Sequence, residues 1–183
     1  MVDGKMMLDL ITSRQSDRSY SDKAVEIEKI DRIIEAGRMA PSACNAQPWK
    51  FIIVTDPELR ARLSEAAKDG ITGINFFLKQ APVQLIVIRE KANMSSRIGS
   101  TIKSKDYSLI DIGIACENIC LQACAEGLGS CMVGWFDEKE VKKILGIPSS
   151  KRVELIIALG YTAKETRVKR RKPLSEVVSY NKY

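Results

Sequence analysis

The chain has 183 residues, of which 45% are hydrophobic and 28% charged, and its formal net charge is +6. This length predicts one domain, with at most an appended arm, and the composition is globular rather than disordered. Histidine is absent, which excludes Ser-His-Asp and Cys-His catalysis and every histidine general base. An enzyme with this sequence therefore relies on carboxylates, lysine, tyrosine, cysteine or a bound cofactor. The positive charge weakly favours anionic ligands or nucleic acid.

The start of the chain, MVDGKMMLD, contains two acids and no apolar run, so it does not resemble a secretion signal. The apolar stretch 107–127 is interrupted by Asp111, Glu117, Asn118 and Gln122. A charge near the centre of a membrane span costs about 2.5–3.5 kcal/mol. We therefore expect a soluble cytoplasmic protein with no membrane partner.

The first half of the chain predicts a short helix over 6–13 and an amphipathic helix over 26–39. One face of the second helix carries Ile27, Ile30, Ile33, Ile34 and Gly37, the spacing of an amphipathic helix. The proline at position 41 ends that helix. The apolar run 51–55 predicts a buried strand, and the Asp-Pro pair at 56–57 predicts a helix that reaches about residue 68.

The second half of the chain alternates strands with helices. We expect strands over 82–89, 130–136 and 152–161, a long helix over 106–127, and a short helix over 137–145. The long helix is apolar nearly all round, which predicts that it is fully buried in the centre of the fold. The polar stretch 90–105 predicts an exposed loop or lid, and 173–183 a short tail. Three layers around one central sheet fit this order.

The five cysteines are an odd number, which favours reduced thiols in a chain without a secretion signal. Cys116, Cys120 and Cys124 are spaced four apart, so they share one face of a helix. That face suits either a metal or cluster site or three small apolar residues in a core. Free cysteine is among the most buried residue types, so the core interpretation is favoured and no metal site is expected.

The segment Arg14-Gln15-Ser16-Asp17-Arg18 suits a phosphate. Two guanidinium groups four residues apart can make bidentate, charge-assisted hydrogen bonds, and the hydroxyl of Ser16 adds a donor. The alternative is a solvated polar turn, because charged loops are common on protein surfaces.

A second candidate segment, PSACNAQPW at 41–49, follows a helix and precedes a strand. Its small side chains let the backbone approach a flat ligand, and Asn45 and Gln47 can match amide-like edges. A rigid connecting turn with Trp49 in the core is an equally good interpretation.

A third candidate segment is Lys169-Arg170-Arg171-Lys172-Pro173-Leu174, in a stretch with six basic residues from 164 to 172. It predicts a second phosphate clamp. The alternatives are a solvated turn and a nucleic-acid patch, which needs a broader basic face and usually aromatic residues to stack bases. The G-x-G at 127–129 follows a helix and lacks a third glycine, so it is not a dinucleotide fingerprint.

Together these segments resemble the nitroreductase family of flavoenzymes, over nearly the whole chain and in the same order. The R-x-S-x-R at 14–18 is similar to the family's phosphate motif, and PS-x-x-N-x-QPW is matched at 41–49. The long helix with Asp111 and Asn118 runs into GLGSCMVGWFD, as in the family, and the end of the chain matches ALGY…K-x-R-x-PL.

The resemblance implies an α+β fold of three layers, with helices flanking a mixed central sheet and residues 1–172 as a single FMN-binding domain. It also implies an obligate homodimer that exchanges C-terminal arms, here 173–183, with two FMN sites at the interface. The implied FMN-binding residues are Arg14, Gln15, Ser16 and Arg18 with Lys169 and Arg171 near the phosphate; Pro41, Ser42, Ala43 and Asn45 from the second subunit; Met132, Val133 and Gly134 along the ring; and Asp111 and Asn75 near the ring.

Three positions depart from the family's pattern. Ala43 stands where many relatives have serine, Gln15 replaces a common arginine or histidine, and Trp135 is larger than the glycine often found there. These departures leave the substrate open.

The function that the resemblance implies is ping-pong transfer of hydride from NAD(P)H, by way of FMN, to nitroaromatic, quinone or similar flat acceptors. The cofactor carries this chemistry, so no catalytic side chain is assigned. Within the same fold, a dehalogenase and a flavin-fragmenting enzyme are alternatives. A flavin-binding protein without turnover is a third, and a basic nucleic-acid binder is disfavoured.

Overall fold

The computed structural model describes residues 3–68, 73–91, 106–162 and 165–183. Its centre is a four-stranded sheet in the order β1-β2-β4-β3, in which neighbouring strands run antiparallel. The strands are β1 (Trp49–Val54), β2 (Val83–Arg89), β3 (Gly129–Val133) and β4 (Arg152–Gly160). A parallel bridge between Ser16 and Ser130 adds the segment after the first helix to the edge of β3.

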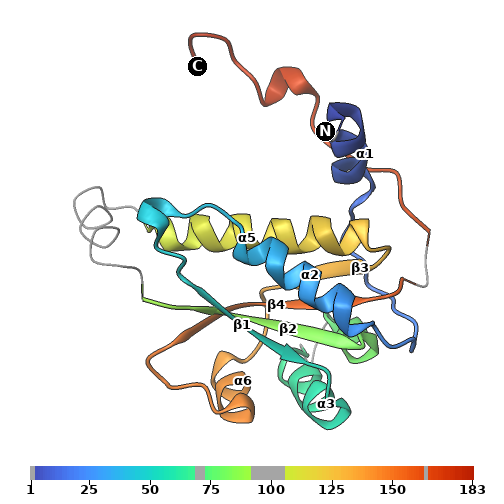
Figure 1. Cartoon of the computed structure of the whole chain (residues 1–183), viewed down its shortest axis with the longest axis vertical. Coiled ribbons are helices and arrows are strands. Elements are labelled where there is room, and N and C mark those ends of the chain that lie inside the picture. Colours follow the sequence, from blue (N-terminus) through green and yellow to red (C-terminus); the bar gives the residue numbers. More distant parts are fainter. Residues whose placement is uncertain (1–2, 69–72, 92–105, 163–164) are drawn as a thin grey trace.

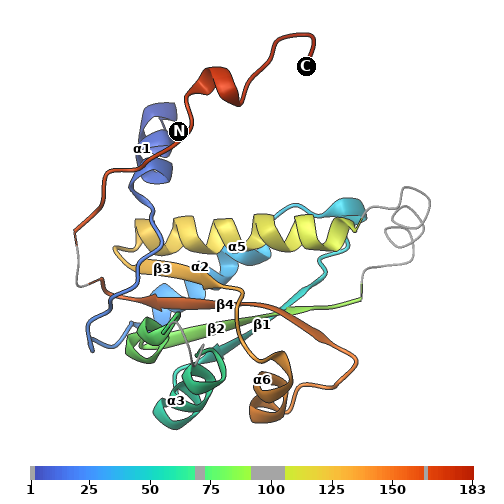
Figure 2. The ribbon, with the colours of Figure 1, turned by 180° about the vertical axis from the view of Figure 1, so that it is seen from behind.

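Helices cover both faces of the sheet (Figures 1 and 2). On one face lie α2 (Ile27–Arg38) and α5 (Tyr107–Ala125), and on the other lie α3 (Pro57–Ala66) and α6 (Glu138–Leu145). The first helix, α1 (Gly4–Ser13), lies beyond α5, next to the C-terminal segment that carries the short 3-10 helix η3 (Leu174–Glu176). The expected α+β architecture of three layers is confirmed.

Three of the expected helices start where an aspartate caps them. The side chains of Asp56, Asp106 and Asp137 each accept a hydrogen bond from a backbone N–H in the first turn of the following helix. Such caps satisfy donors that have no partner within the helix. Residues 92–105 of the expected lid lie outside the described part of the chain.

The strand expected over 130–136 ends earlier, at Val133. The next backbone groups bond to a different layer: the carbonyl of Trp135 accepts from Asn75, and the N–H of Asp137 donates to Ala66 of α3. Because these groups have partners outside the sheet, the chain turns away from β4 at this point.

The expectation that the long helix is fully buried was wrong. One face of α5 packs with α2 on the sheet, but Leu109, Ile110 and Ile114 on its other face are exposed. An apolar composition all round does not reveal which face the rest of the chain covers. Among the described residues, α5 is the one helix long and apolar enough to cross a membrane. Core helices of soluble proteins often have the same length and composition.

Two apolar cores lie on opposite faces of the sheet. The core under α2 and α5 includes Cys116 and Cys120, so the core interpretation holds for these two thiols, whereas Cys124 is half-buried. Burial raises the pKa of Cys116 to about 12 and that of Cys120 to about 11. Both thiols therefore stay protonated near neutral pH and behave as small apolar side chains.

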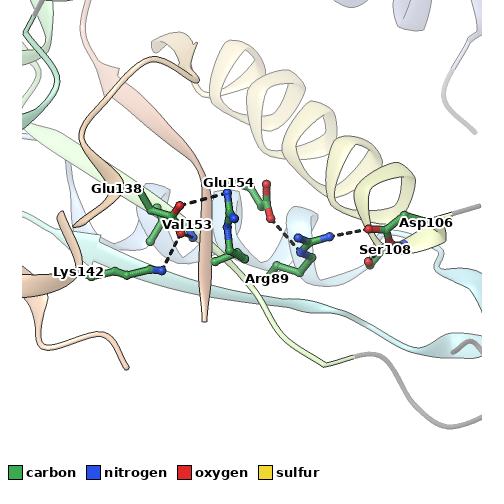
Figure 3. Close-up of polar contacts among 8 residues, drawn as sticks. Arg89, Asp106, Ser108, Glu138, Lys142, Val153 and Glu154 are labelled. Carbon is green, nitrogen blue, oxygen red and sulfur yellow. Dashed lines mark hydrogen bonds and ion pairs between the residues drawn. The ribbon is translucent and has the colours of Figure 1, made fainter. Parts of the chain in front are cut away.

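Ion pairs join the helices to the ends of the strands (Figure 3). Arg89, the last residue of β2, contacts the α5 cap Asp106 at 2.6 Å and Glu154 of β4 at 2.9 Å. At the start of α6, Glu138 accepts from the N–H of Val153 and pairs with Lys142 at 2.8 Å. These contacts orient α5 and α6 on the sheet, although each exposed pair contributes at most about 1 kcal/mol.

Candidate functional site

The two basic segments meet in one cavity of about 350 Å³, called the anion cavity below. Its lining consists of Arg14, Gln15, Ser16, Arg18, Arg167, Val168, Lys169, Arg170 and Arg171. Both views of the ribbon show the segment after β4 returning beside the segment that follows α1 (Figures 1 and 2). The two segments that the sequence suggested for phosphate binding therefore line the same cavity, although they lie near opposite ends of the chain.

Backbone contacts hold the first segment in place. The N–H of Asp17 donates to the carbonyl of Ser130 on β3 at 2.9 Å, and Lys169 reaches across to donate to the carbonyl of Arg14. The strand edge thus supports residues 14–18, and a lysine from the second segment closes over them.

Positive charge is concentrated in the anion cavity. Partial burial lowers the pKa of the Lys169 ammonium, and the positive charges of Arg14 and Arg171 lower it further. Arg14 Nε lies 3.4 Å from Glu117 Oε1. The Nε atom of Arg14 is buried, yet it makes no well-aligned hydrogen bond. Within the described part of the chain, no other acid pairs with the basic residues of the cavity. An anion bound here would relieve the repulsion and satisfy these donors.

A second cavity, of about 630 Å³, adjoins the first and is called the aromatic cavity. It is lined by Arg18, Gly73, Ile74, Asn75, Phe76, Phe77 and Gln80. Arg18 lines both cavities, and its guanidinium lies 6.0 Å from the centre of the Phe77 ring. A ligand with an anionic end and a flat apolar end matches this pair of neighbouring cavities.

Asn75 has a structural role in the described chain. Its side-chain amide donates to the carbonyls of Ala67 at 3.1 Å and Trp135 at 2.9 Å, and its own φ of 71° is left-handed. Asparagine tolerates this conformation better than most residues. Asn75 therefore fixes the backbone of Trp135, whose side chain is 67% exposed. Its expected contact with a flavin ring stays a prediction.

The segment 41–49 forms a tight turn around the 3-10 helix η1 (Ala43–Asn45). Cys44, Asn45 and Gln47 have positive φ values between 46° and 53°. The N–H of Ala43 donates to Asp111 Oδ1 of α5 at 3.1 Å. Asp111 is only 4% exposed, and its Oδ2 has no hydrogen-bond partner among the described residues. The turn is thus joined to α5 by a hydrogen bond, and Trp49 after it packs partly buried against the core, in keeping with the connecting-turn interpretation.

Within one chain, this turn and the anion cavity do not come together. The turn contacts α5 near its N-terminal end, at Asp111, whereas Arg14 of the anion cavity pairs with Glu117, farther along that helix. The ribbon shows the chain segments 41–47 and 14–18 toward opposite ends of α5 (Figure 1). Met132 and Val133 lie on β3, and Gly134 is exposed directly beyond it. A contribution of Pro41, Ser42, Ala43 and Asn45 from a second subunit stays a prediction.

Two residues of the anion cavity region were missed from the sequence. Arg167 lines the cavity and donates to the carbonyl of Ser16 at 2.8 Å; its place in a basic run was the available signal. Asp17 is only 8% exposed. The available signal for Asp17 was a carboxylate placed between the two arginines of the first basic segment.

Residues 11–75 and 71–161 match the model of the nitroreductase family. The chain belongs to the nitroreductase family. It is therefore an oxidoreductase with the nitroreductase fold, and the resemblance noted in the sequence is confirmed.

Relatives of this nitroreductase family member span most of its length. A protein of Archaeoglobus fulgidus named NADH dehydrogenase/NAD(P)H nitroreductase is 33% identical over 162 residues, which are 86% of each chain. An iodotyrosine deiodinase of Thermotoga neapolitana is 29% identical over 86% of this chain and 89% of that protein. The solved structure of an FMN-dependent nitroreductase of Clostridium difficile R20291 is 30% identical, with a TM-score of 0.78 and coverage of 96% and 99%.

Proposed function

We propose that this chain is an NAD(P)H-dependent flavin oxidoreductase that holds the phosphate of FMN in the anion cavity. The observation that carries the proposal is the gathering of Arg14, Arg18, Lys169 and Arg171 from distant segments around one cavity. Partial burial lowers the pKa of Lys169, and the positive charges of Arg14 and Arg171 lower it further; a dianionic phosphate offsets that repulsion. The FMN dependence named for the Clostridium difficile structure supports the same cofactor.

The residues present fit FMN in chemistry as well as charge. Ser16 and the guanidinium groups supply donors for phosphate oxygens, and Arg18 leads from the anion cavity into the aromatic cavity. FMN, when bound, supplies the hydride chemistry that no amino-acid side chain offers. The protein's own part is to bind the phosphate, orient the ring along β3 and exclude water, so no catalytic side chain is proposed.

The acceptor that we propose is a flat nitroaromatic or quinone-like molecule. Ile74, Phe76 and Phe77 give the aromatic cavity apolar walls, which suit an aromatic ring better than a polar substrate. A second candidate reaction is reductive dehalogenation, since the Thermotoga neapolitana relative is named an iodotyrosine deiodinase. A non-catalytic flavin binder is the alternative that the assay below tests, and a flavin-fragmenting enzyme is a further alternative within the same fold.

We further propose a cytoplasmic homodimer, in which residues 1–172 form the domain and 173–183 an arm on the second subunit. Large apolar side chains are exposed on three neighbouring elements: Met6 and Leu8 on α1, Leu109, Ile110 and Ile114 on α5, and Leu174, Val177 and Tyr180 on the arm. Apolar surface of this extent is typical of an interface between chains. A second copy would also bring its own turn at 41–45 toward the ring.

The first test is the visible absorption spectrum of the purified protein, with the released flavin identified after denaturation. We expect flavin bands and about one FMN per chain. NADH and NADPH oxidation is then followed with a nitroaromatic, a quinone and 3-iodotyrosine as acceptors. Turnover with the first two supports a nitroreductase, and turnover with iodotyrosine alone supports the dehalogenase. Bound FMN with no turnover leaves a flavin binder, and a protein that cannot be loaded with FMN refutes the proposal.

A further inference from the structure

Asp17 occupies the back of the loop that forms one wall of the anion cavity. Its backbone N–H bonds to Ser130, and its carbonyl accepts from the hydroxyl of Tyr20 at 2.8 Å. The carboxylate packs so closely on β3 that a Cβ added at Gly129 would lie 2.7 Å from Asp17 Oδ2. The carboxylate is therefore held in a single position behind the cavity rather than in it.

Gln15 connects this carboxylate to the second basic segment. Its Nε2 donates to Asp17 Oδ1 at 2.8 Å and to the carbonyl of Glu165 at 3.4 Å. Its Oε1 accepts from the backbone N–H of Arg167 at 2.9 Å and from the guanidinium Nε of Arg167 at 3.4 Å. All the hydrogen-bonding groups of this amide are thus engaged within the protein.

The chemistry of the partners permits only one orientation of the Gln15 amide. A carboxylate such as Asp17 accepts hydrogen bonds, so the amide NH₂ must face it. A backbone N–H and a guanidinium only donate, so the amide oxygen must face Arg167. Asp17 therefore determines that Gln15 presents an acceptor to Arg167. With both N–H groups already used, Gln15 has no donor left for an anion.

Arg167 is the residue that this arrangement holds. Its Nε lies near Gln15 Oε1, and its Nη2 donates to the carbonyl of Ser16 at 2.8 Å. The side chain lies in an exposed segment and would otherwise sample many rotamers. Two hydrogen bonds from the guanidinium and one from the backbone N–H of Arg167, all to residues 15 and 16, keep it at the cavity wall. Its remaining guanidinium N–H groups are not bonded to any described residue. An anchored guanidinium binds an anion better than a mobile one because less freedom is lost on binding.

We propose that Arg167 is an additional ligand of the phosphate and that Asp17 and Gln15 are positioning residues that act through it. This inference rests on the proposed function, because it concerns the same phosphate. It also revises the expectation that Gln15 binds the phosphate: Gln15 instead orients Arg167, which binds the phosphate.

The test compares FMN with riboflavin, which differs from it only in lacking the phosphate. Dissociation constants for both are measured by flavin fluorescence on the full-length apoprotein and on Arg167→Gln, Gln15→Met and the double variant. Arg152→Gln is the matched control, since Arg152 is an exposed arginine in an ion pair with Glu138, away from the cavity. Thermal unfolding checks that each variant is folded.

We expect Arg167→Gln to weaken FMN binding about tenfold or more, because a charge-assisted hydrogen bond is lost, with riboflavin binding unchanged. Gln15→Met should weaken FMN binding by a smaller factor. The double variant should match Arg167→Gln, because Gln15 acts through Arg167. The control should bind both flavins as the wild type does.

Three outcomes overturn the inference. An equal loss of FMN and riboflavin affinity in Arg167→Gln means that the residue has only a structural role. A further loss on adding Gln15→Met to Arg167→Gln means that Gln15 contacts the phosphate itself. In both cases the wild type still prefers FMN, so the proposed function stands. A wild type that binds FMN no better than riboflavin removes the phosphate site, and the proposed function fails together with the inference.

Discussion

Arg14 is the most buried arginine of the anion cavity. Its side chain is half-buried, its Nε lacks a well-aligned hydrogen bond, and Lys169 is bonded to its carbonyl. Arg171 belongs to the exposed segment opposite, where its Nη1 donates to the neighbouring carbonyl of Arg170. Both arginines therefore offer a guanidinium to an anion, Arg14 from a half-buried position and Arg171 from an exposed one.

Replacing either arginine by alanine should weaken FMN binding by about 2–5 kcal/mol, because each change removes one partner of a charge-assisted contact. We expect the larger loss for Arg14→Ala, since Arg14 is more buried and better held. Equilibrium titration of the apoprotein with FMN measures the change, and Arg152→Ala serves as the charge-matched control. Unchanged affinity in both variants would show that the phosphate binds elsewhere.

The cysteines should differ in reactivity according to their burial. Cys44 is exposed, whereas burial raises the pKa of Cys116 and Cys120 far above neutrality. Because the thiolate is the reactive form, iodoacetamide at pH 8 should label Cys44 in the folded protein and reach Cys116 and Cys120 only after unfolding. Peptide mass spectrometry locates the label. Rapid labelling of Cys116 in the folded state would contradict the packing of α5 on the sheet.

Between elements, the end of α5 is joined to α2 by a compact polar cluster. Arg32 donates twice to the carboxylate of Glu126, at 2.6 and 2.8 Å, and Gln122 donates to the same group. Lys29 caps the helix by donating to the Glu126 carbonyl at 2.7 Å. The hydrogen bond from Arg32 holds the pKa of Glu126 at about 2, below its ordinary value of 4.5. This contact therefore favours the folded state wherever Glu126 is ionised.

The sign of the pH dependence follows from this depressed pKa. The stabilisation by Glu126 is fully present above about pH 4.5 and is lost as the pH falls toward 2. In Glu126→Gln, the free energy of unfolding should therefore fall less steeply across that interval than in the wild type. Urea denaturation at a series of pH values measures both slopes. Equal slopes would mean that Glu126 titrates alike in the folded and unfolded chains.

On the scale of the whole molecule, the C-terminal segment is the part least explained by a single chain. Leu174 is 71% exposed and Tyr180 is 85% exposed, although large apolar side chains of this kind are commonly buried in folded proteins. The C-terminal segment extends past α1 and away from the sheet (Figure 1). An arm of this kind gains stability only when another surface covers it.

Deleting residues 173–183 should shift the protein toward a monomer and weaken FMN binding, because the arm and the second subunit's turn at 41–45 would both be lost from the site. Sedimentation velocity measures the oligomeric state, and circular dichroism checks that the shortened chain is folded. A truncated protein that remains dimeric with full FMN affinity would assign the arm a different role.

Local signals in the sequence were sufficient for most of the secondary structure. The caps at Asp56, Asp106 and Asp137 and the apolar periodicity act over one or two turns, so they can be read without knowing the fold. The motifs at 14–18 and 169–174 likewise indicated an anion site, because residue type alone determines which groups can donate to an anion. The flavin was implied only by the resemblance of these motifs and of 41–49 to the family. Their combination also indicated the family.

Only the tertiary structure decided how these parts meet. The strand order β1-β2-β4-β3, the exposed face of α5 and the early end of β3 depend on which surfaces pack together, and no local pattern encodes that choice. The same holds for the relay from Asp17 through Gln15 to Arg167. From the sequence alone, the carboxylate of Asp17 could pair with any nearby cation. Its packing on β3 and the position of the segment after β4 determine that it bonds to Gln15. The sequence by itself determined the chemistry available to this protein, and long-range packing decided which of those groups line the anion cavity and which hold the others in place.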